Sequence, residues 1–214
     1  MRFPTPLLIA VALALVASSC AFGNGDVTTE SRSVSAFDSV RVEGAGLLSV
    51  HGGAQKVEIT SDSSILPYVT TTVSGSTLII GFKPGVSIHD PSSLEYDITM
   101  PSLSGIELDG ACDCDIDAFD YDSIRIALNG SGGASLRASA NSIAIDLSGA
   151  GSVTASDLAA MAATVKISGV GSVALRVAKT LDATLSGVGD LSYWGSPAVS
   201  TKISGLGRVI KAGD

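Results

Sequence analysis

The stretch Ile145-Asp146-Leu147-Ser148-Gly149-Ala150-Gly151-Ser152-Val153 joins a short alternating apolar segment to a Gly-x-Gly pair, and this pattern recurs along the chain. The first glycines of successive copies are Gly110, Gly130, Gly149, Gly169, Gly187 and Gly205, the copy at Gly110 having Cys112 in place of the second glycine. The copies are therefore 18 to 20 residues apart. A period this short and this regular predicts coils of chain stacked on one another.

Residues alternate within each copy, so that one side of the segment faces a core and the other faces water. The glycines suit the corner that follows, because stacked corners leave little room for Cβ atoms and glycine adopts positive φ without steric cost. The sequence therefore predicts an all-β fold, a single-stranded, right-handed parallel β-helix or solenoid with coils of about 18–20 residues. The residues expected to line one continuous core are Ile145, Leu147, Val165, Ile167, Leu185 and Ile203.

The composition indicates a folded, acidic protein that does not bind nucleic acid. Of the 214 residues, 45% are hydrophobic, which is enough for a core, and the formal net charge is −8 with 13 Lys and Arg. Such an acidic chain lacks the basic surface that phosphate backbones require, so no nucleic-acid binding is expected.

The N-terminus has the three regions of an export signal. Met1-Arg2 precedes an apolar run over residues 7–16, which is too short to span a bilayer permanently. The run ends in Val16-Ala17-Ser18-Ser19-Cys20, which resembles a bacterial lipobox, so Cys20 is the predicted site of lipidation. The alternative is an ordinary signal-peptidase cut after Ala21, which Ser19-x-Ala21 also suits.

These features divide the chain into three parts. Residues 1–19 are expected to be a lipoprotein signal peptide, residues 20–32 a polar tether, and residues 33–214 the β-helical domain. Phe22, rather than an aspartate, stands two residues after Cys20, so nothing indicates retention in the inner membrane. The expected location is the cell envelope, at the outer membrane or the cell surface.

The serial repeats are accompanied by two flanking motifs. Phe37-Asp38-Ser39-Val40 opens the domain, and Tyr193-Trp194-Gly195-Ser196-Pro197 stands before its last repeat. With these motifs the chain resembles the bacterial auto-transporter adhesin family with the head GIN domain, over residues 33–212. The resemblance implies an exported β-helical protein, often a lipoprotein, and it brings no catalytic residues.

Cys112-Asp113-Cys114-Asp115-Ile116-Asp117 is the one chemically unusual stretch. In register with the later repeats, Cys114 takes the inward place of Val153, so a buried thiol is its expected state. A disulfide between cysteines two apart would be strained, and a zinc site would need more soft ligands than these two cysteines.

Two candidate binding features remain. Asp113, Asp115 and Asp117 alternate along one segment and would share an outward face, where they could bind a cation, although an acidic solvated face is the commoner meaning of such a run. Trp194 alternates to the side opposite Tyr193 and could stack on a sugar or peptide, or simply cover the last coil.

The sequence predicts a protein without enzymatic activity. It has two histidines, no nucleophile elbow and only scattered basic residues, and no cofactor is expected. The favoured function is an envelope-anchored, adhesin-like surface lipoprotein, whose partners are the membrane, through the lipid, and a glycan or protein ligand. The alternatives are a structural or assembly component of the envelope and a polysaccharide-acting enzyme.

Overall fold

The computed structural model describes residues 19–214, so the signal peptide expected over residues 1–19 lies outside the described residues except for its last one. The strands before the regular repeats are β1 (Ser19–Phe22), β2 (Val27–Ser31), β3 (Ser39–Val42), β4 (Gly46–Gly52), β5 (Lys56–Asp62), β6 (Val69–Ser74), β7 (Thr77–Phe82), β8 (Val86–His89) and β9 (Leu94–Met100), with the 3₁₀ turn η1 (Leu66–Tyr68) between β5 and β6. The strands of the repeats are β10 (Gly105–Leu108), β11 (Cys112–Leu128), β12 (Ser131–Leu147), β13 (Ala150–Ile167), β14 (Val170–Leu185), β15 (Val188–Trp194), β16 (Ala198–Ile203) and β17 (Leu206–Gly213). No helix formed by residues 19–214 has the length and apolar character needed to cross a bilayer.

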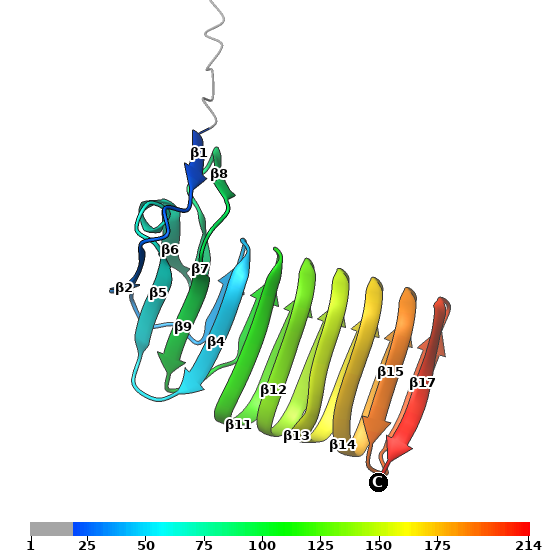
Figure 1. Ribbon diagram of the computed structural model, residues 1–214. Coiled ribbons are helices and arrows are strands. Elements are labelled where there is room, and N and C mark those ends of the chain that lie inside the picture. The colour runs from blue at the N-terminus through cyan, green and yellow to red at the C-terminus, as the bar shows by residue number, and fades with distance from the viewer. Residues whose placement is uncertain (1–18) are drawn as a thin grey trace, which may run out of the picture.

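The repeats form the predicted β-solenoid. From β10 to β17 every pairing is parallel, and equivalent residues of successive coils lie beside one another, as Val153 pairs with Ala134 on one side and Val173 on the other. Figure 1 shows the coils stacked in a row, with their Gly-x-Gly corners along one side of the molecule. The all-β fold and the stacking of the coils are therefore confirmed.

The core runs along the inside of the coils, as the alternation requires. Of the six residues expected to line it, Ile145, Leu147, Val165, Ile167 and Leu185 are buried. The expectation for Ile203 is wrong, because this residue is 46% exposed. Its strand, β16, lies in the last coil of the described chain and pairs only with β14, so one side of that coil is open.

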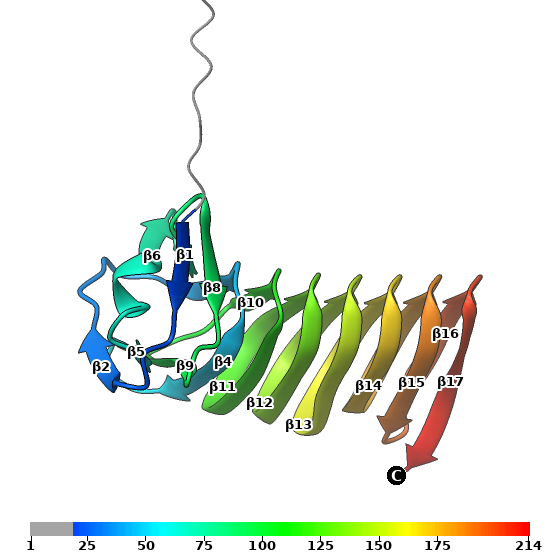
Figure 2. The same cartoon turned by 45° about the horizontal axis from the view of Figure 1, so that its top comes forward.

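The N-terminal part closes the other end of the solenoid with antiparallel pairs. β7 extends the parallel row beyond β3 and pairs antiparallel with β6, while β5 pairs antiparallel with both β9 and β2. This part holds Tyr96, the largest fully buried side chain among the described residues, whose hydroxyl donates a hydrogen bond to the Ala45 carbonyl oxygen at 2.8 Å. Figure 2 shows these strands gathered at one end of the row of coils.

The structure differs from the tether expected over residues 20–32. β1 pairs with β8 in a parallel, two-stranded sheet, and β2 pairs with β5, so both segments belong to the fold. Asp62, at the end of β5, is buried and connects this segment to the rest of the fold. Its Oδ1 accepts a hydrogen bond from the Gly25 amide at 2.6 Å, and its Oδ2 accepts one from the Ser92 amide at 2.7 Å. The backbone of β2 pairs with the edge of β5, while the side chains of β2 stay exposed to solvent.

The Asp62 carboxylate makes the stability of this attachment depend on pH. Burial alone raises the pKa of the carboxyl, but hydrogen bonds from Ser92 and Gly25 outweigh it, and the pKa lies below its ordinary value. Because the folded pKa is lowered, the stabilisation is complete above about pH 4, the unfolded value, and disappears as the pH falls through the folded pKa. Asp62→Asn should therefore lower the urea midpoint near neutral pH, by an amount that shrinks below about pH 4. A difference that is constant between acid and neutral pH would contradict this assignment.

Candidate binding surface

A flat polar surface lies on the strand segments that lead into the Gly-x-Gly corners. Two rows of outward residues run across it from coil to coil, and together they define the polar face. One row consists of Arg41, Glu107, Ala127, Asp146, Lys166, Thr184 and Lys202, which pair in register. The other consists of the residues directly before the first glycines: Glu43, Asp109, Asn129, Ser148, Ser168, Ser186 and Ser204.

At its β3 and β10 end the polar face is acidic. The Arg41 Nε atom lies 2.6 Å from Asp109 Oδ2, 3.3 Å from Glu43 Oε1 and 3.9 Å from Glu107 Oε2. The hydrogen bond to Asp109 raises the pKa of the Arg41 guanidinium. Three carboxylates thus surround one guanidinium at a half-exposed site, where each ion pair stabilises the fold by at most about 1 kcal/mol. The cluster contributes charge and fixed geometry to the surface more than it contributes stability.

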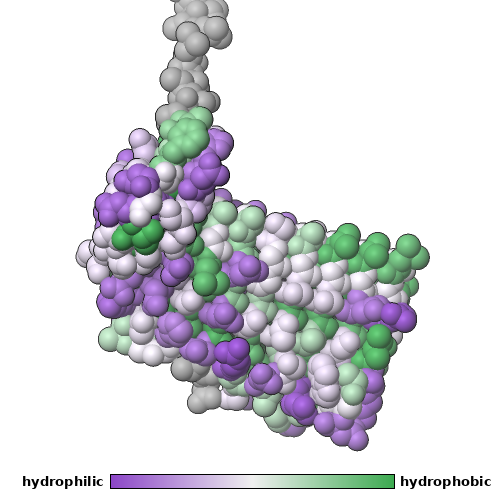
Figure 3. Space-filling view, viewed as in Figure 1, coloured by the Kyte–Doolittle hydropathy of each residue, from purple (hydrophilic) through white to green (hydrophobic). Residues whose placement is uncertain are grey.

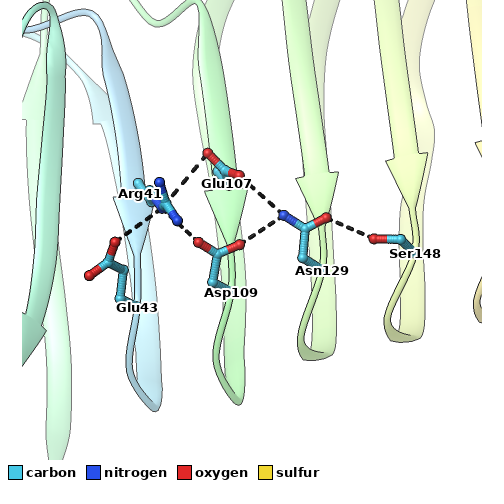
Figure 4. Close-up of polar contacts among 6 residues, drawn as sticks. All are labelled: Arg41, Glu43, Glu107, Asp109, Asn129 and Ser148. Atoms are coloured by element: carbon cyan, nitrogen blue, oxygen red, sulfur yellow. Dashed lines mark hydrogen bonds and ion pairs between the residues drawn. The ribbon is translucent and has the colours of Figure 1, made fainter.

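Asn129 continues the network to the next coils. Its Nδ2 donates hydrogen bonds to Asp109 Oδ1 at 2.8 Å and to Glu107 Oε1 at 3.1 Å, while its Oδ1 accepts one from the Ser148 hydroxyl at 2.8 Å. Figure 4 shows Asn129 between Asp109 and Ser148 on neighbouring strands, with Arg41 and Glu43 on the other side of Asp109. The result is a ladder of fixed donors and acceptors on a rigid sheet.

Two open grooves lie on these strand segments, one on the polar face and one farther from the corners. Near the acidic end of the polar face, Gly105 and Ala127 form the floor of an open depression bordered by Glu107, Arg125 and Asn129. Toward the C-terminal coils, apolar and small polar residues line the second open groove: Ser142, Ile143, Ala162, Ala163, Thr164, Thr180, Leu181, Asp182, Ala198, Val199 and Ser200. Both are surface grooves, which suit an extended ligand better than an enclosed small molecule.

The predicted acidic residues lie on another face. Asp113, Asp115 and Asp117 point outward from the first half of β11, beyond the corner from the polar face. Asp113 Oδ1 accepts a hydrogen bond from the Gly133 amide at 2.8 Å, and Asp117 Oδ1 lies 2.7 Å from His51 Nδ1. Within residues 19–214, no group of three or more His, Cys, Asp or Glu side chains is arranged to hold a metal ion. Cation binding at this row stays a prediction.

Both cysteines of this stretch are buried free thiols. Cys114 pairs with Ala134, which pairs with Val153, so its predicted inward place is confirmed. Burial raises the pKa of the Cys112 thiol to about 11 and raises that of Cys114 as well. At neutral pH the thiols are therefore protonated, and they act as small apolar side chains rather than nucleophiles or metal ligands.

Trp194 and Cys20 are not part of the polar face. Trp194 ends β15 in register with Arg176, is half-buried, and lies against Gly213 of the C-terminal strand. This contact favours the interpretation that Trp194 covers the last coil. Cys20 is exposed on β1, at the N-terminal end of the described chain.

Sequence reasoning missed the polar face, although a signal for it was present. The residue before each first glycine is polar in every copy, from Glu43 through Asn129 to Ser204. Read across the copies instead of along the chain, this column predicts an exposed polar row. Arg41 lies beside Glu107 and Asp109 because β3 pairs with β10. The repeat pattern does not predict which N-terminal strand pairs with β10.

Comparisons with known proteins agree with the fold. The family model described as "Putative auto-transporter adhesin, head GIN domain" matches residues 36–197. Among solved structures, a "putative adhesin" from Bacteroides fragilis is 21% identical, with a TM-score of 0.75, over 88% of this chain and 98% of its own. A "putative adhesin" from Parabacteroides merdae is 20% identical, with a TM-score of 0.54, over 90% and 98%. A "putative lipid binding protein" from Parabacteroides distasonis is 19% identical, with a TM-score of 0.55, over 91% and 100%. At these identities the structures show the fold alone, and no curated protein matches this chain.

Proposed function

This chain belongs to the auto-transporter adhesin, head GIN domain family, and we propose that it is a non-enzymatic, lipid-anchored protein of the cell envelope that binds its ligand on the solenoid surface. The family description supports an adhesin-like role and a location at the envelope or surface. The proposed anchor is the lipidated thiol of Cys20. In this proposal residues 20–32 connect the anchor to the solenoid, and β1 and β2 within them pair with β8 and β5.

The polar face is the observation that carries this proposal. Its hydroxyls, amides and carboxylates repeat from coil to coil, about 4.8 Å apart, on a backbone held rigid by neighbouring coils on both sides. An extended ligand with its own repeating polar groups, such as a polysaccharide, would meet the same pattern of donors and acceptors several times. Binding of this kind needs many weak contacts and no deep pocket.

The exposure and pairing of the charged side chains on the polar face support a binding role. The titratable side chains of the polar face are partly exposed, and their ion pairs lie at the surface. A polysaccharide-cleaving enzyme needs two carboxylates facing each other across a cleft, one of them with a raised pKa. Asp109, the most buried acid of the polar face, is instead paired with Arg41 and Asn129.

An assembly role is the second candidate, and the open end of the solenoid favours it. β16 pairs only with β14, and β17 only with β15, so in the described chain both present an unpaired edge. Val199 and Ile203 of this coil are 40% and 46% exposed. Unpaired edges with apolar neighbours are the surfaces on which strands of another chain add.

The proposal is tested by presenting the protein to arrays of glycans and matrix proteins, with the chain itself included as a target. Asn129→Ala combined with Glu107→Ala should weaken binding to the identified ligand about ten-fold, because both residues belong to the ladder. Thr154→Ala, an exposed change on a different face of the solenoid, is the matched control and should leave affinity unchanged.

Each other outcome selects another function. Equal binding by the two variants would remove the polar face as the site. Binding only to the chain itself would favour the assembly role. Turnover of a glycan that is abolished by changing one acidic residue would overturn the non-enzymatic interpretation.

A further inference from the structure

A row of apolar side chains stands free on the Gly-x-Gly corners of the last coils. The residue between the two glycines points out of the corner, and in the last three coils this residue is Val170, Val188 or Leu206, which lie in register. Their exposed fractions are 58%, 48% and 79%. We name these three residues the corner ridge.

The corner does not require an apolar side chain at this position. The earlier coils carry Ala45, Ala111, Ser131 and Ala150 in the same place. Glycines flank each ridge residue along the chain, and an open groove that includes Gly171, Gly189 and Gly207 runs beside the ridge. Large apolar side chains kept in water at three consecutive coils indicate a contact surface.

The corner ridge and the proposed anchor face the same side of the molecule. β1 carries Cys20, and Figures 1 and 2 show the β1–β8 pair rising beyond the line of corners on that side. Phe22, also on β1, is 58% exposed and stacks on His89 with ring centroids 5.1 Å apart. Figure 3 shows hydrophobic surface at the β1 end and again along the corners of the last coils, both on the upper edge.

The spacing of these features fits a flat partner. A plane resting on the raised β1–β8 pair and on the far corners would pass over the corners between them. Those corners are the ones with Ala or Ser. Beside the groove, Asp190 and Arg208 form an ion pair of 2.8 Å, which suits the polar boundary of a membrane better than the interior of a protein interface.

We propose that the solenoid lies along the surface of the lipid bilayer, with Phe22 near the anchor and the corner ridge at the far end as its second point of contact. This inference rests on the proposed lipidation of Cys20. A lipid at that position would hold the ridge side of the solenoid within reach of the membrane, so that a small apolar surface is sufficient for the contact. The polar face, on the strands leading into the corners, remains open to the side.

Tryptophan fluorescence tests this orientation on the full-length protein, purified from membranes and reconstituted into phosphatidylethanolamine and phosphatidylglycerol vesicles with brominated acyl chains. The chain has one tryptophan, Trp194, at the end of β15 opposite the corner. In a Trp194→Phe background, Leu206→Trp places the only tryptophan on the ridge, at an exposed site where the fold should tolerate it. Its emission should fall about two-fold with brominated lipid, as for a side chain at the acyl boundary. The wild-type Trp194 should be quenched little, and adding Val170→Ser and Val188→Ser should reduce the quenching at position 206.

The mass of the N-terminal peptide separates failure of the anchor from failure of the orientation. An acylated protein whose tryptophan at position 206 is quenched no more than Trp194 would overturn the orientation alone. A peptide without acyl chains would overturn both the anchor and the orientation that rests on it.

Discussion

Replacing Gly169 by alanine should lower the midpoint of thermal unfolding by roughly 6–12 °C, which corresponds to about 3 kcal/mol for a chain of this size. A Cβ atom added to Gly169 would overlap the carbonyl oxygen of Gly149 in the preceding coil. That oxygen accepts the hydrogen bond from the Val170 amide at 2.9 Å, so it cannot move away without breaking the ladder between the coils. Thermal unfolding followed by circular dichroism measures the effect.

The same collision occurs at every first glycine of the row. A Cβ on Gly130, Gly187 or Gly205 would likewise meet the carbonyl oxygen of the first glycine one coil earlier. None of these residues has a positive φ, so close approach of backbones, not conformational freedom, selects glycine here. The ability of glycine to adopt a positive φ matters instead at second glycines such as Gly132, whose φ is 123°.

Gly133→Ala is the matched control. Gly133 follows Gly132 in β12, but a Cβ there would be 3.5 Å from its nearest neighbours, which is ordinary contact. Because alanine restricts the unfolded chain more than glycine does, this change should be neutral or stabilise the protein by up to about 1 kcal/mol. Equal losses of stability at positions 169 and 133 would show that the corner has no special packing requirement.

The solenoid could be predicted from the sequence because each coil repeats one physical problem. A segment such as Ile145 to Leu147 must bury one side, and its corner must stack on an identical corner, so side-chain alternation and glycine spacing identify both requirements. Ile203 follows the same alternation and yet is exposed. Burial of such a residue also requires a neighbouring coil on each side, and β16 has one only on the side of β14.

The N-terminal part could not be predicted in the same way, because its contacts are not periodic. β1 pairs with β8 across a separation of more than 60 residues, and Asp62 joins Gly25 to Ser92. The side chains of β2 are exposed although its backbone pairs with β5, and composition alone does not distinguish such an exposed edge strand from a solvated tether. The acidic cluster around Arg41 depends on the same non-periodic pairing of β3 with β10.

Cys20→Ala should move essentially all of the protein from the membrane or detergent phase to the soluble phase. Acyl chains contribute about 0.8 kcal/mol for each buried CH₂ group, and two chains together hold a protein at a membrane stably. The corner ridge, three apolar side chains, is too small to replace two acyl chains. Detergent phase partitioning of the wild type and the variant, expressed at equal levels, measures the change.

Cys112→Ala is the control for loss of a thiol. Because Cys112 is buried in the solenoid, this substitution should leave attachment to the membrane unchanged. A soluble wild type whose first residue is Phe22 would show that cleavage follows Ala21 and that there is no anchor. The pairing of β1 favours the other outcome. Cleavage before Cys20 keeps the pairs of Cys20, Ala21 and Phe22 with β8, whereas cleavage after Ala21 leaves only the pair of Phe22 with His89. Cleavage before Cys20, which lipidation requires, would therefore leave more of the described β1–β8 pairing in place than cleavage after Ala21.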